Sequence, residues 1–108
     1  MFLKRKPIRS KAYTDAARDQ ACAMNSPWCS YDPRTTVLAH SNWAEDGKGA
    51  SQKADDLFGA DLCSECHRWL DTGPASREEK RDAFHRAMKV TLRRRWDQGL
   101  LTIKGAKL

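Results

Sequence analysis

Four cysteines in two close pairs constrain the fold of this 108-residue chain more than any other feature. Six residues separate Cys22 from Cys29, and two separate Cys63 from Cys66. Because the first residues lack the apolar stretch of a secretory signal, we expect the reducing cytoplasm, where structural disulfides are rare. The two pairs therefore predict a tetrahedral site for a structural Zn²⁺, with disulfides or unlinked thiols as the alternatives. Zinc binding would compensate for the small core that so short a chain can bury.

The charge balance favours a nucleic-acid partner. The chain has 20 Lys and Arg against 14 Asp and Glu, a formal net charge of +6, and phosphate contacts supply most non-specific affinity. A membrane span needs about 20 consecutive apolar residues, and no apolar run in the chain approaches that length, so no membrane association is expected. Residues 1–11 are predicted to form a basic arm that is either solvated or in contact with phosphates. Its basic residues are Lys4, Arg5, Lys6, Arg9 and Lys11.

Residues 12–108 are predicted to form one domain that begins with a short helix, because alanines recur over residues 10–20. The β-branched run at 35–40 predicts a strand that ends at His40, and residues 57–62 return beside it. Between them, the Gly-, Ser- and charge-rich residues 41–56 are expected to form a long surface loop. A short helix is expected over about 64–71.

The clearest element is a long C-terminal helix, predicted over about 76–98. Ser76 and Glu79 have the spacing of a capping box, and Gly99 is a natural stop. Its basic end is either a DNA-facing patch or a solvated face, and it contains Lys89, Arg93, Arg94 and Arg95. The residues expected to pack into the core are Phe84, Ala87, Met88, Thr91, Leu92 and Trp96. Together the elements predict an α+β fold, with a small zinc-stabilised ββα core at about 35–72 and this long amphipathic helix.

Three residues can carry chemistry in such a fold. The zinc site would hold the start of the short helix beside the first cysteine pair, so His67 and His40 are expected to approach one another. Asp71 lies four residues after His67, hence on the same helix face, where the two side chains can bind one divalent cation. His40 could then deprotonate a water, as phosphodiester hydrolysis requires. The alternatives are a satisfied surface His40 and a His67 that only contacts a thiolate or a neighbouring ring.

Residues 22–71 resemble the HNH (ββα-metal) endonuclease superfamily, and more narrowly the small YbcO-like nucleases of prophages. The residues that carry the resemblance are Ala17-Arg18, Cys22, Cys29, Val37-Leu38-Ala39-His40, Lys53, Asp56-Leu57, Cys63-Ser64-Glu65-Cys66-His67 and Leu70-Asp71. The resemblance implies an HNH-like fold and a metal-dependent DNA endonuclease. It also implies a phage or prophage origin and action in the cytoplasm of a bacterial host.

The resemblance further implies roles for individual residues. His40 matches the general base, His67 matches a ligand of the catalytic cation (Mg²⁺, Mn²⁺ or Ni²⁺), and the four cysteines match a structural zinc site. Asp71 occupies a position where some members carry a further His ligand. Ala39 stands where many members carry a metal-ligating Asp or His, so Asp71 or Asp56 is expected to compensate.

The remaining candidates have weaker patterns. Asn42 is the candidate for the middle Asn of the motif and is expected either to orient the His40 imidazole or to bind backbone. Lys53 and Asp56 would position a phosphate or a metal-bound water, or serve a local structural role. Arg93 and Arg94 are candidate DNA contacts, and His85 is expected at the surface.

Two other functions are consistent with these residues. The first is a non-catalytic, zinc-stabilised nucleic-acid-binding module that binds no second metal. The second is a zinc-knuckle adaptor that binds another protein through Trp43 and Trp69. Two copies acting together could cut both DNA strands, so a homodimer is a further candidate assembly.

Overall fold

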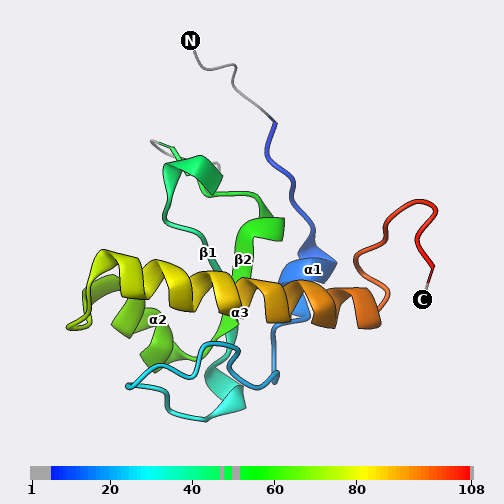
Figure 1. Cartoon of the computed structure of the whole chain (residues 1–108). Helices are drawn as coiled ribbons and strands as arrows, with labels where there is room; N and C mark the ends of the chain where they lie inside the picture. Colours follow the sequence, from blue (N-terminus) through cyan, green and yellow to red (C-terminus); the bar gives the residue numbers. More distant parts are fainter. Residues whose placement is uncertain (1–5, 47, 50–51, 108) are drawn as a thin grey trace.

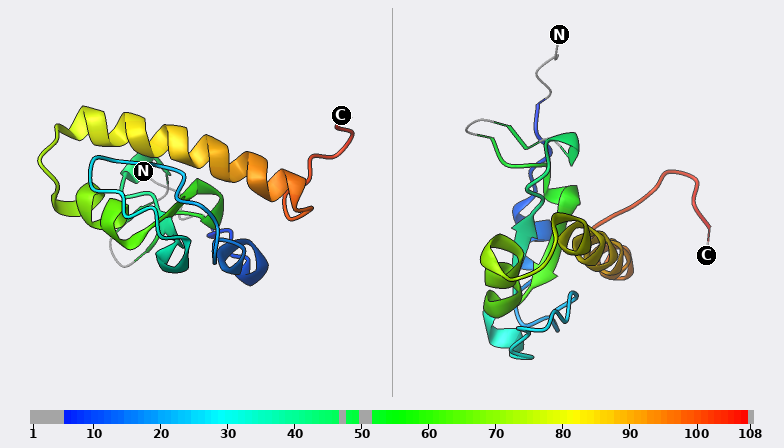
Figure 2. Two further views of the ribbon diagram at one scale, coloured as in Figure 1. Left: turned by 90° about the horizontal axis from the view of Figure 1, so that it is seen from below. Right: turned by 60° about the vertical axis from the view of Figure 1, so that its left-hand side comes forward.

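The computed structural model describes residues 6–46, 48–49 and 52–107, and its centre is a two-stranded antiparallel sheet. In the sheet, Val37 lies opposite Leu62 and His40 lies opposite Gly59. The second strand runs into a helix, which gives a ββα unit, and a long helix packs across the sheet (Figures 1 and 2). The α+β class and the long C-terminal helix are therefore confirmed. The elements are α1 (Lys11–Asp15), β1 (Val37–His40), β2 (Gly59–Leu62), α2 (Ser64–Thr72) and α3 (Arg77–Asp97).

The first helix is shorter than predicted from residues 10–20. Ser10 caps α1, because its hydroxyl accepts a hydrogen bond from the Tyr13 backbone N–H at 3.1 Å. The chain then turns, and Asp19 adopts a left-handed conformation with φ of 62°. An α-helix cannot continue through such a residue. The helical propensity of Ala16 and Ala17 thus does not extend α1, because the chain turns directly after Asp15.

Both strands are shorter than predicted, because a 3₁₀ turn lies at the predicted start of each strand. Thr35 belongs to the turn Pro33–Thr35, in which the Asp32 carboxylate accepts from the Arg34 backbone N–H at 3.0 Å. The turn Asp56–Phe58 likewise precedes β2. Sequence-based boundaries shift in this way because turn chemistry competes with β-branched propensity.

Helix α3 has the predicted ends, and its buried face includes the predicted Phe84, Ala87 and Thr91. The Ser76 hydroxyl accepts from the Glu79 backbone N–H at 3.0 Å, and Gly99, with φ of 75°, ends the helix in a left-handed conformation. The predicted core residues Met88, Leu92 and Trp96 are only half buried. Over the described residues, every helix is too short or too polar to cross a lipid bilayer. The buried residues of α3 are Ala83, Phe84, Ala87, Thr91 and Arg95.

The predicted surface loop at 41–56, of which residues 47, 50 and 51 lie outside the described part, contributes to the core. Trp43 is 6% exposed, and its ring lies 5.5 Å from that of Phe84. Trp69 on α2 is 5% exposed. Because both indoles are buried, neither offers a partner the exposed surface on which the adaptor hypothesis depends.

A buried ion pair joins the sheet to the end of α3. Asp61 on β2 and Arg95 are both fully buried, with Nη2–Oδ1 at 2.6 Å and Nη1–Oδ2 at 3.1 Å. The Arg95 Nε donates to the Tyr13 carbonyl at 2.9 Å, and its guanidinium lies over the Tyr13 ring. Arg95, predicted to belong to the basic end of α3, is therefore an internal residue, because its guanidinium pairs with the buried carboxylate of Asp61.

We expect Arg95→Met to destabilise the fold by about 3–5 kcal/mol, because it leaves a buried carboxylate without its main partner. Chemical denaturation followed by circular dichroism measures this loss. The matched control is Arg93→Met on the exposed side of α3, expected to change stability by less than about 0.5 kcal/mol. Equal denaturation midpoints for the two variants would contradict the role assigned to the ion pair.

Candidate functional site

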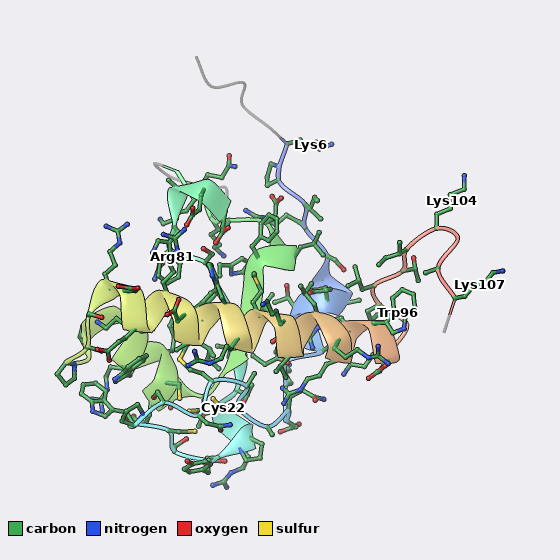
Figure 3. All side chains as sticks on the ribbon, in the orientation of Figure 1. Lys6, Cys22, Arg81, Trp96, Lys104 and Lys107 are labelled. Carbon is green, nitrogen blue, oxygen red and sulfur yellow. The ribbon has the colours of Figure 1, made fainter. Side chains whose placement is uncertain are left out.

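The four cysteines converge at one point between the N-terminal loops and α2. Their sulfur atoms all lie within 4.8 Å of one another, and no disulfide joins them. The Cys29 and Cys63 sulfurs are 3.8 Å apart. A tetrahedral site with Zn–S bonds of about 2.3 Å has sulfurs about 3.8 Å apart, so the group can hold a metal ion such as Zn²⁺. Figure 3 labels Cys22, which lies below α3 in that view.

The wide first cysteine pair forms a loop that supports the second pair. Asn25 in this loop adopts a left-handed conformation with φ of 51°. The next residue, Ser26, directs its backbone N–H and its hydroxyl at the Cys66 sulfur, at 3.3 and 3.1 Å. Hydrogen bonds of this kind orient a ligand and stabilise its charged form. The loop between Cys22 and Cys29 thus carries two of the sulfurs at its ends and also contacts the Cys66 sulfur through Ser26.

The thiols differ in how readily they ionise when no cation lies among them. Burial raises the pKa of Cys66 and of Cys29. Burial also opposes ionisation of Cys63, but hydrogen bonds from Ser30 and from the Cys66 backbone outweigh it and lower its pKa to about 6. A metal ion must therefore displace protons from Cys29 and Cys66, so its affinity decreases as the pH falls.

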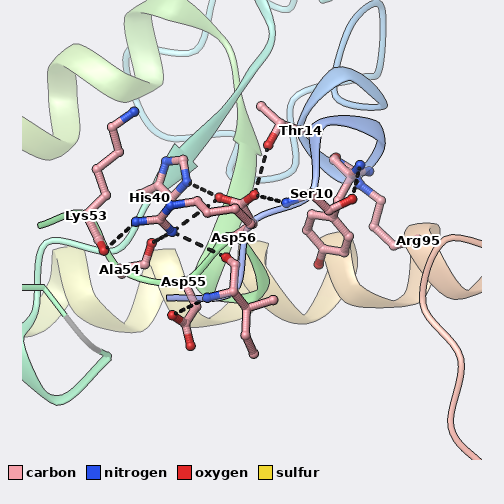
Figure 4. Close-up of polar contacts among 11 residues, drawn as sticks. Ser10, Thr14, His40, Lys53, Ala54, Asp55, Asp56 and Arg95 are labelled. Carbon is pink, nitrogen blue, oxygen red and sulfur yellow. Dashed lines mark hydrogen bonds and ion pairs between the residues drawn. The ribbon is translucent and has the colours of Figure 1, made fainter. Parts of the chain in front are cut away.

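His40, the last residue of β1, is held by a buried carboxylate (Figure 4). Its Nε2 lies 2.7 Å from Oδ1 of Asp56, whose side chain is 7% exposed. The other oxygen of Asp56 accepts from the Ser10 backbone N–H at 2.6 Å and from the Thr14 hydroxyl at 3.4 Å. Asp56 therefore makes the contact to His40 that the sequence predicts as one alternative for Asn42. The sequence signal for this contact is Asp56 itself, an acidic residue directly before the predicted strand 57–62.

A shallow pocket of about 290 Å³ lies in front of His40, and its basic residues outnumber its acidic ones. Arg9, Lys11 and Lys53 line it together with Asp15, which pairs with Lys11, and Asp56. Arg9 is held in place by the carbonyls of Ala54 at 2.7 Å and of Lys53 at 2.9 Å, whereas the Lys53 side chain is exposed. Positive side chains around an imidazole favour a bound phosphate.

The predicted basic arm is partly built into this pocket. The Ile8 backbone N–H donates to Oδ1 of Asp55 at 3.0 Å, and the Ile8 carbonyl accepts from the Asp56 backbone N–H at 3.0 Å. Residues 8–10 thus lie along residues 53–56 as part of the fold. Residues 1–5, with Lys4 and Arg5, lie outside the described part of the chain.

A second pair of candidate ligands lies on α2. Nε2 of His67 is 4.0 Å from Oδ2 of Asp71, and both side chains are about half exposed. Neighbouring ligand atoms of a six-coordinate cation, each about 2.1 Å from it, lie about 3.0 Å apart, so the two side chains must move closer together to bind one such ion side by side. Within the described residues, the cysteines are the only group of three or more candidate ligands. A cation on α2 would thus take its other ligands from water or phosphate.

Asn42 connects the two histidine sites. It follows His40 by two residues, and its Nδ2 donates to Oδ1 of Asp71 at 3.3 Å. His40 and His67, both described, share no hydrogen bond. The segment after β1 is therefore joined to α2 by this hydrogen bond. Asn42 contacts Asp71, the predicted cation ligand, and not His40, the predicted base.

The candidate DNA contacts on α3 differ in their availability. Arg93 is exposed and pairs with Asp97 at 3.2 Å. Arg94 donates to the Ala21 carbonyl at 2.7 Å and to Asp61 at 3.2 Å, so its guanidinium is engaged within the fold. His85, expected at the surface, is half buried, with its ring 6.2 Å from that of Trp43.

The fold and the site together define a small α+β protein with a four-cysteine centre and a histidine–carboxylate pair in a basic pocket. The sequence profile described as "Putative nuclease YbcO" matches residues 11–99. The chain belongs to this YbcO family, which confirms the narrower resemblance and supports a nuclease, a hydrolase whose substrate is nucleic acid.

A solved structure of a phage-related protein has a similar fold. The chain is similar to "a putative bacteriophage protein from Escherichia coli str. K-12 substr. MG1655", with a TM-score of 0.63 and 25% identity. The match covers 80% of this chain and 98% of that one. A comparison with curated proteins found no match.

Proposed function

We propose that this protein is a metal-dependent HNH-type endonuclease that hydrolyses DNA phosphodiester bonds. In this proposal it is encoded by a phage or prophage and acts in the cytoplasm of a bacterial host. The observation that carries the proposal is the His40 imidazole, held at 2.7 Å by a buried carboxylate within a basic pocket of a ββα unit. The YbcO family supports the nuclease activity.

In the proposed reaction, His40 takes a proton from a water molecule, and the water oxygen forms a bond to phosphorus. The bond between phosphorus and the 3′-oxygen breaks, and its electron pair stays on that oxygen. The 3′-oxygen then accepts a proton from solvent, which leaves a 5′-phosphate and a 3′-hydroxyl. A divalent cation held by His67 and Asp71 would supply positive charge to the phosphate and the leaving oxygen.

The other predicted site residues are proposed to hold a cation ligand in place or to contact the DNA phosphates. Asn42 holds the Asp71 carboxylate through its amide. Lys53, on the wall of the His40 pocket, is proposed to contact the phosphate next to the scissile bond, and Arg93 a phosphate farther along the DNA. Lys104 and Lys107 on the C-terminal tail project into solvent and could extend this contact (Figure 3). Because each chain has one such site, a double-strand cut would take two copies, as in a homodimer.

The test of the function is nicking of supercoiled plasmid by the purified protein with Mg²⁺, Mn²⁺ or Ni²⁺. We expect cleavage that requires added cation, and we expect Asp71→Ala to raise the cation concentration for half-maximal rate at least about 10-fold, because a ligand is lost. The matched control is Asp82→Ala, which removes an exposed carboxylate from α3 and should leave the titration unchanged.

Two results would change the conclusion. An unchanged cation titration in Asp71→Ala would remove Asp71 from the site. Tight, salt-sensitive DNA binding without cleavage under any cation would favour the non-catalytic nucleic-acid-binding module, because phosphate contacts alone produce that salt dependence.

A further inference from the structure

We propose that Asp56 is a positioning residue that fixes the tautomer of His40, so that Nδ1 is the nitrogen that accepts the proton from water. The inference rests on the proposed role of His40 as general base. It adds a specific carboxylate and a specific nitrogen atom to that role.

The contact between the two side chains determines where the imidazole proton lies. Nε2 of His40 is 2.7 Å from Oδ1 of Asp56. An ionised carboxylate can only accept hydrogen bonds, so Nε2 must carry the proton. In the neutral imidazole, the lone pair is then on Nδ1. When Nδ1 takes a proton from water, the resulting imidazolium lies against the negative charge of Asp56.

The carboxylate is held so firmly that it can impose this choice. Oδ2 of Asp56 accepts from the Ser10 backbone N–H at 2.6 Å and from the Thr14 hydroxyl at 3.4 Å. Nη1 of Arg9 lies 3.5 Å from Oδ1. Both oxygens are therefore occupied, and the side chain has no free rotation. Figure 4 shows Ser10, Thr14 and His40 arranged around Asp56.

The same contacts keep Asp56 ionised. Burial raises the pKa of this carboxyl group, but the hydrogen bonds from His40 and Ser10 and the charge of Arg9 together bring it below its ordinary value. The carboxylate is thus negative at neutral pH. Three of the groups that surround it, Arg9, Ser10 and Thr14, come from the N-terminal segment, so this segment completes the site.

The substitution Asp56→Asn should reverse the tautomer. The short Ser10 N–H contact requires an oxygen at the Oδ2 position, so the Asn carbonyl should take that place. The amide nitrogen then faces His40 and donates to Nε2, which must act as acceptor. The imidazole proton moves to Nδ1 and blocks the proposed base. We expect the cleavage rate to fall about 10²–10⁴-fold, the usual contribution of a general base, with little change in DNA affinity.

Asp55→Asn is the matched control. Asp55 is the buried neighbour of Asp56, and its Oδ1 accepts the Ile8 backbone N–H at 3.0 Å. An Asn at 55 keeps a carbonyl oxygen for that bond and does not touch His40. We expect this variant to have the wild-type tautomer and near wild-type cleavage.

The experiment is a long-range ¹H–¹⁵N NMR spectrum of the His40 ring in the full-length protein, together with plasmid nicking by the same samples. We expect the proton on Nε2 in wild type and Asp55→Asn, and on Nδ1 in Asp56→Asn. A wild-type proton on Nδ1 would overturn the inference even if the Asp56 variant failed to fold. Cleavage by Asp56→Asn as fast as by Asp55→Asn would also overturn it. A wild type with the expected tautomer that cleaves no plasmid would instead overturn the proposed function.

Discussion

His40→Ala is expected to reduce the rate of plasmid nicking by about 10²–10⁴-fold, while the protein stays folded and keeps its metal content. The imidazole is the proposed base, because the two carboxylates that line the same pocket, Asp15 and Asp56, are each paired with donors. His40 also lies outside the cysteine cluster, so its loss should not affect the metal bound there. Initial nicking rates and metal analysis of wild type and variant measure both effects.

His85→Ala is the control for this prediction. It removes an imidazole from α3, where the ring packs beside Trp43 and lines none of the His40 pocket. We expect a small loss of stability and near wild-type cleavage. Loss of metal or unfolding in His40→Ala would show that the base and the structural site were assigned wrongly. Equal cleavage by His40→Ala and wild type would point to another base or to a contaminating nuclease.

The parts of the fold that the sequence predicts are those with local causes. The Ser76 cap, the stop at Gly99 and the cysteine pairs each depend on residues a few positions apart. Burial of Arg95 has a distant cause, because its partner Asp61 lies 34 residues earlier. Helical spacing places Arg95 on the buried face, but its charge argues for the surface. Only an acidic residue within an otherwise apolar strand hints at the pair.

The site follows the same rule. His40, His67 and Asp71 are identified from strand and helix positions, because their spacing along one element is meaningful. The Asp56–His40 contact and the docking of residues 8–10 depend on how a 16-residue loop and the N-terminal segment pack, which periodicity does not encode. Residue-type patterns thus find the proposed reacting groups, whereas the contacts that orient those side chains form between distant segments of the chain.

Cys63→Ser is expected to leave the protein unfolded at 25 °C. Binding of a structural zinc ion contributes on the order of 10 kcal/mol to folding, which is comparable to the whole stability of about 5–15 kcal/mol of a small domain. Cys63 also caps α2, since its sulfur accepts from the Cys66 backbone N–H at 3.4 Å, and it packs in the main core with Leu62 and Phe84. The serine hydroxyl can still cap α2, so the substitution acts by removing a metal ligand and by placing a hydroxyl among apolar core residues.

Circular dichroism, thermal unfolding and zinc analysis test this expectation, with Ser64→Ala as the control. Ser64 is the exposed first residue of α2, so its loss should cost less than about 0.5 kcal/mol and leave the zinc content unchanged. A strong chelator should unfold wild type and Ser64→Ala but produce no further change in Cys63→Ser, because that variant has already lost its metal. Acidification should weaken zinc binding in the same way, because protons compete for the sulfurs. A folded, chelator-resistant Cys63→Ser would mean that the four sulfurs pack as thiols and that the core alone stabilises the fold.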